Sequence, residues 1–295
     1  MKKVIFKGAG VALVTPMNKD GSVNYDTLGQ LIEFQIKNGT DAIITCGTTG
    51  ESATLSFEEK LKVIKFTIEK TAKRIPVIAG TGCNDTEATL KSSIKAQELG
   101  VDGLLIVTPY YNKTSQSGLI KHYKYIADRV DIPIILYNVP SRTGVNIKPE
   151  TCAELSKHPN ICAIKEASGD VSQVAKIKNL CGENLNIYSG NDDQIVPLLS
   201  LGGIGVISVF SNICPKECHL LVKEYLEGNV KIASKMQIKY LELMNAMFCD
   251  VNPIPVKEAL NMMGYGCGRC RMPLDILSEE NCKKLEKIMK KFSLI

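Results

Sequence analysis

Residues 76–109 read PVIAGTGCNDTEATLKSSIKAQELGVDGLLIVTP. An apolar run at Pro76–Gly82 is followed by a polar segment and then by a second apolar run at Gly103–Pro109. Asn84 or Asp85 can cap a helix in the polar segment. Both runs are continuously apolar, as is typical of strands covered on both faces in a parallel sheet. The stretch therefore predicts a strand, a helix and a second, parallel strand.

The same unit recurs along the chain. The apolar runs start 18 to 34 residues apart, which is the spacing of strand–helix units rather than of hairpins. Eight such units predict an α/β fold, namely a (β/α)8 TIM barrel. A doubly wound open sheet is the alternative, but the turn after the first run has no glycine-rich phosphate motif. The eight runs are Val11–Pro16, Ala42–Gly47, Pro76–Gly82, Gly103–Pro109, Ile132–Val139, Ile161–Ala167, Asn186–Gly190 and Ile204–Val209.

The pattern changes near residue 212, where the strand-like runs stop. Amphipathic segments then predict helices over about 216–227, 230–248, 254–263 and 278–292. We therefore expect a catalytic barrel over 1–212 and a C-terminal helical domain over 213–295. Packing on the barrel or contact between subunits is the expected role of this helical extension.

Composition and charge narrow the function classes. The chain has 295 residues, 44% of them hydrophobic and 23% charged, which argues against disorder. No apolar run reaches the roughly 18 residues of a membrane span. The net charge is +5, and the lysines are interleaved with acidic residues along the chain. We therefore expect no nucleic-acid partner and favour a small anionic substrate. The basic N-terminus lacks the apolar core of a signal peptide, so we expect a cytoplasmic protein.

The 11 cysteines are interpreted as reduced thiols that serve as small apolar side chains. Cys267 with Cys270 and Cys214 with Cys218 have spacings compatible with zinc. However, the histidines show no ligand spacing and no second CxxC completes a set of four. We expect no metal, and a structural zinc is the alternative interpretation of these thiols.

Polar residues follow several strands, where the reactive groups of such barrels gather. The second strand is followed by GTTGE at residues 47–51, whose N–H groups can bind a carboxylate or a phosphate. Tyr110, Tyr111 and Tyr137 can pass protons, and Arg142 can hold a carboxylate with two hydrogen bonds. The alternatives are an ordinary turn at residues 47–51, amphipathic packing for the three tyrosines and a solvated charge for Arg142.

Lys165 interrupts the apolar strand Ile161–Ala167. Strand alternation places it on the same face as Ala163, and this face points into the barrel if Cys162 faces the helices. Burying an ammonium is costly, so such a lysine either pairs with a carboxylate or loses its proton. An uncharged amine is a nucleophile that can form a Schiff base with a carbonyl compound.

Taken in order along essentially the whole chain, five motifs resemble the dihydrodipicolinate synthase family of pyruvate-dependent class I aldolases. The resemblance implies condensation of pyruvate with L-aspartate 4-semialdehyde to 4-hydroxy-tetrahydrodipicolinate, in diaminopimelate and lysine biosynthesis, without a metal or organic cofactor. The motifs are Gly47–Ser52, Thr108–Asn112, Tyr137–Gly144, Ile164–Asp170 and Gly203–Val209.

The resemblance also implies catalytic roles. Lys165 would form the Schiff base with pyruvate, and Tyr137 would donate and accept protons. Thr48 and Tyr111 would complete a proton relay, with Tyr111 supplied by the neighbouring subunit. We therefore expect a homo-oligomer, and a tetramer is the usual form of the family.

Substrate-binding roles follow from the same resemblance. Thr49 and the main chain near Ile207 would hold the pyruvate carboxylate. Arg142 would receive the carboxylate of the semialdehyde, and Gly190 would shape the pocket. The sialic-acid lyases of the superfamily lack an arginine at the position of Arg142.

Two other functions stay open at this point. One is an aldolase for 2-keto-3-deoxy sugar acids or for N-acetylneuraminate, from the same superfamily. The other is a catalytically idle barrel that binds 2-oxo acids. The lysine-sensitive members of the family carry histidines where this chain has Phe57 and Lys60, and a glutamate where it has Ala88. We therefore expect weak or absent feedback inhibition by lysine.

Overall fold

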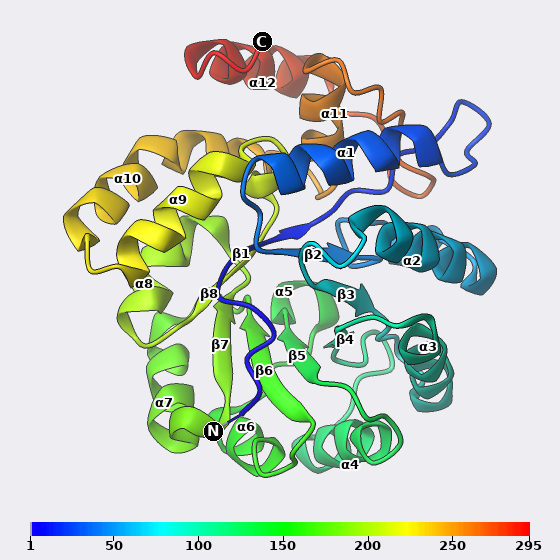
Figure 1. Ribbon diagram of the computed structural model, residues 1–295, viewed down its shortest axis with the longest axis vertical. Coiled ribbons are helices and arrows are strands. Elements are labelled where there is room, and N and C mark those ends of the chain that lie inside the picture. The colour runs from blue at the N-terminus through cyan, green and yellow to red at the C-terminus, as the bar shows by residue number, and fades with distance from the viewer. Residues whose placement is uncertain (1) are drawn as a thin grey trace.

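The computed structural model describes residues 2–295 and contains a closed barrel of parallel strands (Figure 1). Each strand pairs with the next one in sequence, and β1 pairs with β8 to close the ring. The predicted (β/α)8 barrel with C-terminal helices is therefore confirmed. The strands are β1 Gly8–Ala12, β2 Ala42–Thr45, β3 Val77–Gly80, β4 Gly103–Val107, β5 Ile134–Asn138, β6 Ile161–Glu166, β7 Asn186–Ser189 and β8 Gly205–Ser208.

Helices connect the strands and surround the barrel (Figure 1). Asn24 caps α1, and Ser56 with Glu59 forms a capping box at the start of α2. Asp85, rather than Asn84, caps α3. The connecting helices are α1 Tyr25–Lys37, α2 Phe57–Thr71, α3 Thr86–Leu99, α4 Gln116–Ala127, α5 Pro140–Thr143, α6 Pro149–Leu155, α7 Val171–Cys181 and α8 Ile195–Ser200. Short 3-10 turns are η1 Ser52–Thr54, η2 Gly182–Asn184, η3 Asp192–Gln194 and η4 Phe210–Asn212.

The last strand is followed by α9 Pro215–Leu226, α10 Val230–Ala246, α11 Ile254–Met262 and α12 Glu279–Lys291. Their bounds lie within two residues of the predicted helices. In Figure 1, α11 and α12 lie beyond α1, at the end of the view opposite to α4 and α6. α9 packs against β1 and takes the eighth place in the ring of helices, although it lies beyond residue 212. The division into domains 1–212 and 213–295 stays a prediction.

The barrel interior is filled with side chains. Inward-facing residues of the strands form one buried cluster that includes Ile44, Ile135 and Ile207. Below them the rings of Phe6 and Tyr188 stack with centroids 4.4 Å apart, and the Tyr188 hydroxyl donates to the Phe6 carbonyl at 2.7 Å. The amino end of the barrel is therefore closed, and the carboxyl end is the side on which a ligand can enter.

The first strand differs from its prediction, because it spans Gly8–Ala12 instead of Val11–Pro16. Small residues with little strand preference hide its start in the sequence. Gly10 is required there by close packing, since a Cβ atom on it would lie 2.7 Å from Ile44 Cδ1 and 2.8 Å from the Phe6 ring. The same packing seats Phe6 at the floor of the barrel.

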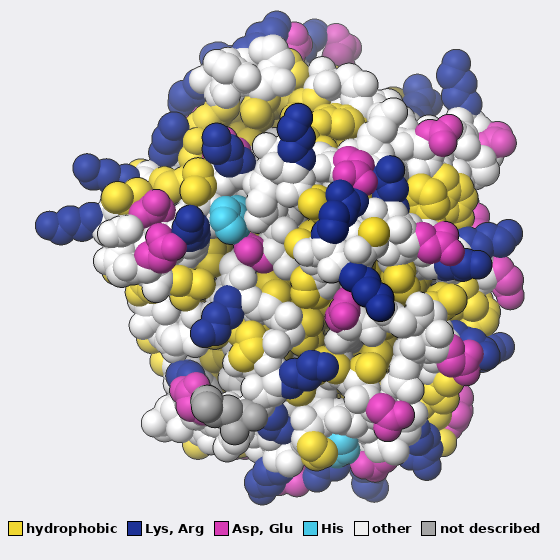
Figure 2. Space-filling view, viewed as in Figure 1, with side chains coloured by type: hydrophobic (Ala, Val, Ile, Leu, Met, Phe, Trp, Pro, Cys, Tyr) yellow, Lys and Arg dark blue, Asp and Glu magenta, His cyan; other side chains and the backbone are white. Residues whose placement is uncertain are grey.

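The surface carries mixed charge. On the face drawn in Figure 2, Lys and Arg side chains are scattered with Asp and Glu side chains between them rather than gathered in one patch. No helix among residues 2–295 combines the length and apolarity needed to cross a membrane.

Candidate active site

Lys165 and Tyr137 lie side by side inside the barrel. β5 and β6 are neighbours, and their register places Tyr137 opposite Lys165. The Lys165 side chain is 5% exposed, and its Nζ lies 4.4 Å from the centroid of the Tyr137 ring. Within residues 2–295 Lys165 forms no ion pair, in contrast to the buried Lys257. The alternative interpretation, in which Lys165 pairs with a carboxylate, therefore does not hold among the described residues.

Asp192 is a buried acid whose carboxyl is influenced by the charge of Lys165. Burial raises the pKa of its carboxyl, whereas hydrogen bonds and the positive charge of Lys165 act in the opposite direction. Oδ2 accepts from the N–H groups of Val209 and Phe210 at 3.0 and 2.8 Å. Oδ1 has no partner within the described chain. Asp192 thus fixes the segment after β8, a role that strand alternation did not indicate.

The turn after β2 carries Thr48 and Thr49 at the same end of the barrel. Thr49 is buried, and its Oγ1 accepts from Asn252 Nδ2 at 3.0 Å. Thr48 lines a small space of about 30 Å³ together with Tyr137. The turn leaves β2 through Cys46, whose φ of 53° is left-handed. Thr48 therefore faces the same interior space as Tyr137, whereas the hydroxyl of Thr49 is bound to Asn252.

A cavity of about 260 Å³ opens above these residues. Thr48 lies on its inner side, and Arg142 and Asn252 also line it. Arg142 belongs to the short helix α5, and its Nη2 donates to the main-chain oxygen of Asn252 at 3.4 Å. Its guanidinium forms no ion pair with residues 2–295, so its other donors are available to a ligand. Thr48 lines both this cavity and the small space beside Tyr137, so the two adjoin at Thr48.

Asn252 was missed in the sequence because it lies in the helical extension, far from the strand ends. It contacts both Thr49 and Arg142. Its buried Oδ1 has no hydrogen-bond partner among the described residues. Asn252 therefore links the threonine turn to Arg142 at the wall of the cavity.

Gly190 and Ile207 lie on the opposite side of Lys165 from β5. Gly190 follows β7 and donates its N–H to the Glu166 carbonyl at 2.7 Å. A Cβ atom there would lie 2.6 Å from Ala167 Cβ, so only glycine fits this approach of the two chains. Ile207 is fully buried on β8 and belongs to the interior cluster.

Tyr111 is the one predicted site residue that the single chain does not bring to the others. Its side chain is 90% exposed, and it does not line the cavity that contains Thr48 and Arg142. Its φ of 69° is left-handed, which is uncommon for a bulky residue. The loop after β4 thus holds this phenol away from its own barrel.

A buried ion pair anchors the threonine turn to the C-terminal helices. Glu51 Oε1 accepts from Lys257 Nζ at 2.8 Å, and Oε2 accepts from the N–H of Arg271 at 2.8 Å. Lys257 also donates to the carbonyl of Arg269 at 2.9 Å. Arg271 in turn forms two hydrogen bonds with Glu59 at the start of α2. The turn is therefore fixed from behind.

The same segment contains the CxxC motif. Burial raises the pKa of the Cys267 and Cys270 thiols to about 12. Among residues 2–295, no group of three or more Cys, His, Asp or Glu side chains is arranged to hold a metal ion. The backbone of this segment instead serves the Glu51–Lys257 pair described above.

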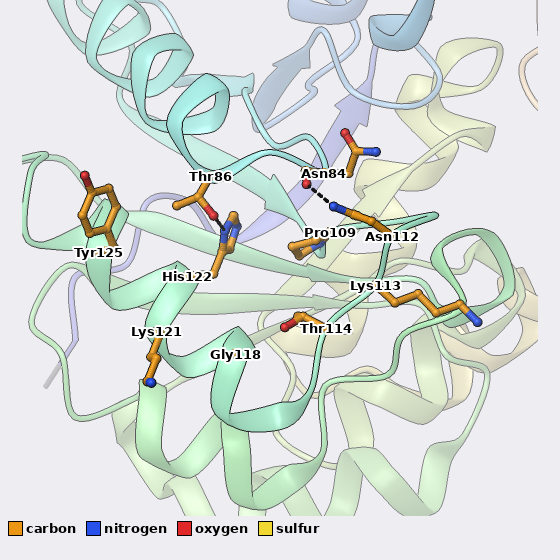
Figure 3. A pocket seen from close by; sticks show the side chains of 10 residues that line it. All are labelled: Asn84, Thr86, Pro109, Asn112, Lys113, Thr114, Gly118, Lys121, His122 and Tyr125. Atoms are coloured by element: carbon orange, nitrogen blue, oxygen red, sulfur yellow. Dashed lines mark hydrogen bonds between the residues drawn. The ribbon is translucent and has the colours of Figure 1, made fainter.

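A second cavity, of about 340 Å³, lies between the starts of α3 and α4 and contains none of the predicted site residues (Figure 3). Thr86 Oγ1 lies 2.9 Å from Nδ1 of His122, and burial lowers the pKa of that imidazole to about 4. Figure 3 shows the ammonium groups of Lys113 and Lys121 pointing to different sides. These charges do not converge on one ligand.

Comparison with known proteins identifies the family. The model of the dihydrodipicolinate synthetase family matches residues 5–292. The chain is 59% identical over 285 residues to a 4-hydroxy-tetrahydrodipicolinate synthase of Caldicellulosiruptor saccharolyticus, covering 97% of this chain and 96% of the relative. It is 54% identical over 291 residues to 4-hydroxy-tetrahydrodipicolinate synthase 1 of Clostridium acetobutylicum, covering 99% of both.

A solved structure agrees with these relatives. The chloride-inhibited dihydrodipicolinate synthase of Acinetobacter baumannii, complexed with pyruvate, superposes with a TM-score of 0.97 at 43% identity. The superposition covers 99% of this chain and 100% of the other. Fold and similarity along the whole length agree, and the chain belongs to the dihydrodipicolinate synthetase family.

Proposed function

We propose that this enzyme condenses pyruvate with L-aspartate 4-semialdehyde to give 4-hydroxy-tetrahydrodipicolinate and water. The observation that carries the proposal is a buried lysine without an ion-pair partner in the described chain, beside a tyrosine that lines a small space adjoining an open cavity. Relatives named for this reaction are 54% to 59% identical to the chain. An amine in such a place can attack a carbonyl carbon.

The first step forms the Schiff base. The uncharged Lys165 amine attacks C2 of pyruvate, and the C2 oxygen leaves as water. Thr49 and the main chain near Ile207 bind the pyruvate carboxylate. Because the interior is dry and the carboxylate is fixed, the imine forms in one orientation.

The second step makes the carbon–carbon bond. Loss of a proton from the pyruvate methyl group gives an enamine, whose carbon attacks the aldehyde of the second substrate. Tyr137 transfers protons in these steps, relayed by Thr48 and by Tyr111 of the neighbouring subunit. The substrate amine then displaces Lys165 from C2, which closes the ring and restores the free lysine.

Arg142 and Asn252 receive the second substrate at the rim. The Arg142 guanidinium binds its carboxylate, since it has donors that no residue of the described chain uses. The main-chain oxygen of Asn252 accepts from Arg142 and so holds the guanidinium at the cavity. This pair favours an amino acid aldehyde over a neutral sugar.

We further propose that the working form is a cytoplasmic homo-oligomer, with a tetramer as the expected size. The exposed side chain of Tyr111 supports this, because a phenol held away from its own barrel is available to a second copy. The barrel over 1–212 would carry the chemistry, and the helical domain over 213–295 would support it through Glu51 and Lys257.

Borohydride trapping tests the proposal. Pyruvate with borohydride should attach covalently to Lys165 in the parent enzyme, located by peptide mapping. Lys165→Ala should lose the adduct and at least about 10³-fold in kcat, the scale of removing a nucleophile. Lys176→Ala on α7 is the control and should keep both.

A coupled assay with each substrate separates the alternatives. Turnover of a 2-keto-3-deoxy sugar acid without turnover of aspartate semialdehyde would contradict the proposal in favour of the sugar acid aldolase. Absence of any adduct on Lys165 would leave a barrel that only binds 2-oxo acids.

A further inference from the structure

A second pair of residues on β5 and β6, Asn138 and Glu166, follows directly after Tyr137 and Lys165. The register of β5 and β6 sets Tyr137 opposite Lys165, and it sets Asn138 opposite Glu166. Successive residues of a strand point to opposite faces of the sheet. Tyr137 and Lys165 meet inside the barrel, so Asn138 and Glu166 meet on its outer face, under the helices.

Glu166 is a buried carboxylate whose hydrogen-bond partners are all uncharged. Its side chain is almost fully enclosed, and Nδ2 of Asn138 donates to its two oxygens at 3.0 and 3.2 Å. The N–H of Ser168 donates at 2.7 Å and Gln173 Nε2 at 3.2 Å. None of the Lys, Arg or His side chains in residues 2–295 forms an ion pair with it.

The hydrogen bonds continue into the surrounding elements. Asn138 Oδ1 accepts from the N–H of Ile147 at 2.9 Å, and its Nδ2 also donates to Asn146 Oδ1 at 2.8 Å. Asn146 and Gln173 exchange two hydrogen bonds, at 2.7 and 3.1 Å. The pair is therefore held by α7 and by the loop before α6, so neither strand can shift without breaking this network.

A buried carboxylate without a cation is costly to the fold, even where hydrogen bonds reduce that cost. The charge therefore has a use if a positive charge arises nearby. Glu166 follows Lys165 directly in β6, and strand alternation places its carboxylate on the other side of the strand. A protonated Schiff base on Lys165 is such a positive charge, and a fixed anion in a dry interior stabilises it.

We propose that Asn138 and Glu166 are positioning residues that fix the spacing of Tyr137 and Lys165 and place a negative charge behind the Schiff base. This inference rests on the proposed function, because it concerns the same lysine. Neither residue touches the substrate.

Glu166→Gln is the first test, because it removes the charge and keeps the size of the side chain. We expect kcat and the rate of borohydride trapping to fall about 10- to 100-fold, the usual effect of losing a group that orients a reactive residue. KM for pyruvate should change less than kcat, since the residues that bind its carboxylate are untouched. Glu154→Gln, in a half-buried ion pair of α6 with Lys124, is the control and should behave as the parent enzyme.

The exchange variant Asn138→Asp with Glu166→Gln is the second test, because it restores an amide–carboxylate pair with the charge moved to β5. We expect it to recover part of the rate lost by either single variant. It also serves as the measured variant if Glu166→Gln alone does not fold, and circular dichroism decides that. A purely structural role predicts lower stability with unchanged kcat in the folded protein.

Two outcomes separate this inference from the proposed function. A parent enzyme that forms no adduct with pyruvate contradicts the proposed function itself. A parent enzyme that forms the adduct, with a folded Glu166→Gln or exchange variant of equal kcat and trapping rate, contradicts only the inference about Asn138 and Glu166.

Discussion

Two buried carboxylates at the carboxyl end of the barrel, Glu51 and Glu166, are stabilised in different ways. Glu51 is bonded to the ammonium of Lys257, which comes from a helix 206 residues away in sequence. Glu166 is bonded to amides and a main-chain N–H from the strands and helices next to it. One site depends on an opposite charge, and the other depends on a network of neutral donors.

The difference shows how the two sites respond to change. Glu51 holds the threonine turn to the C-terminal helices, so loss of its partner leaves a bare charge in the interior. Glu166 carries its charge with hydrogen bonds alone, and burial raises the pKa of its carboxyl. The first site should therefore respond most to substitution, and the second to pH.

The largest effect on stability should come from Lys257→Met. The variant leaves Glu51 buried without a cation, which costs about 3–5 kcal/mol in the free energy of unfolding. Urea unfolding followed by circular dichroism measures it. A loss below 1 kcal/mol would mean that water or another residue takes the place of the ammonium.

The double variant Glu51→Gln with Lys257→Met should be more stable than Lys257→Met alone. Removing both charges removes the unpaired one, and the expected recovery is about 1–3 kcal/mol. The same unfolding assay gives the coupling energy. A double variant no more stable than the single one would show that the methionine itself, and not the bare carboxylate, causes the loss.

A pH series on Glu166→Gln should show the smaller, titratable cost of the second site. Because the pKa of Glu166 is higher in the folded state, its ionised form opposes folding. The penalty is absent below the ordinary glutamate pKa of about 4.3 and grows as pH rises through the folded value. The stability of the variant relative to the parent should therefore increase between acid and neutral pH, and a flat difference would contradict this.

The smallest effect should come from Lys283→Met on α12. Lys283 and Glu279 form an i, i+4 ion pair at 2.6 Å, but their side chains are 72% and 84% exposed. Water already solvates both charges, so the expected loss is at most about 0.5 kcal/mol. The same assay used for Lys257→Met checks whether burial, rather than the ion pair itself, accounts for the contrast.

Local patterns in the sequence were sufficient to predict most of the fold. Continuous apolar runs predict seven of the strands within a few residues, and a cap residue such as Asp85 predicts where a helix begins. Strand alternation predicts that Lys165 faces inward, and its side chain lies beside Tyr137. The first strand was shifted because Gly8 and Gly10 are selected by close packing rather than by strand preference.

Contacts between distant segments could not be predicted in this way. No periodicity links Thr49 to Asn252 or Glu51 to Lys257, since each pair joins the barrel to the helical extension. The sequence also shows Lys165 and Glu166 only as adjacent charges. Their different surroundings appear once the strands are paired and the helices cover one face.

The stacked rings of Phe6 and Tyr188 close the amino end of the barrel, so a ligand can enter only at the carboxyl end. Arg142 lines the cavity at the open end, and this cavity adjoins the small space beside Tyr137 at Thr48. In the proposed reaction, pyruvate must therefore bind to Lys165 before L-aspartate 4-semialdehyde enters. The product must leave before the next pyruvate can bind. The closed amino end of the barrel thus determines the order in which ligands bind and leave.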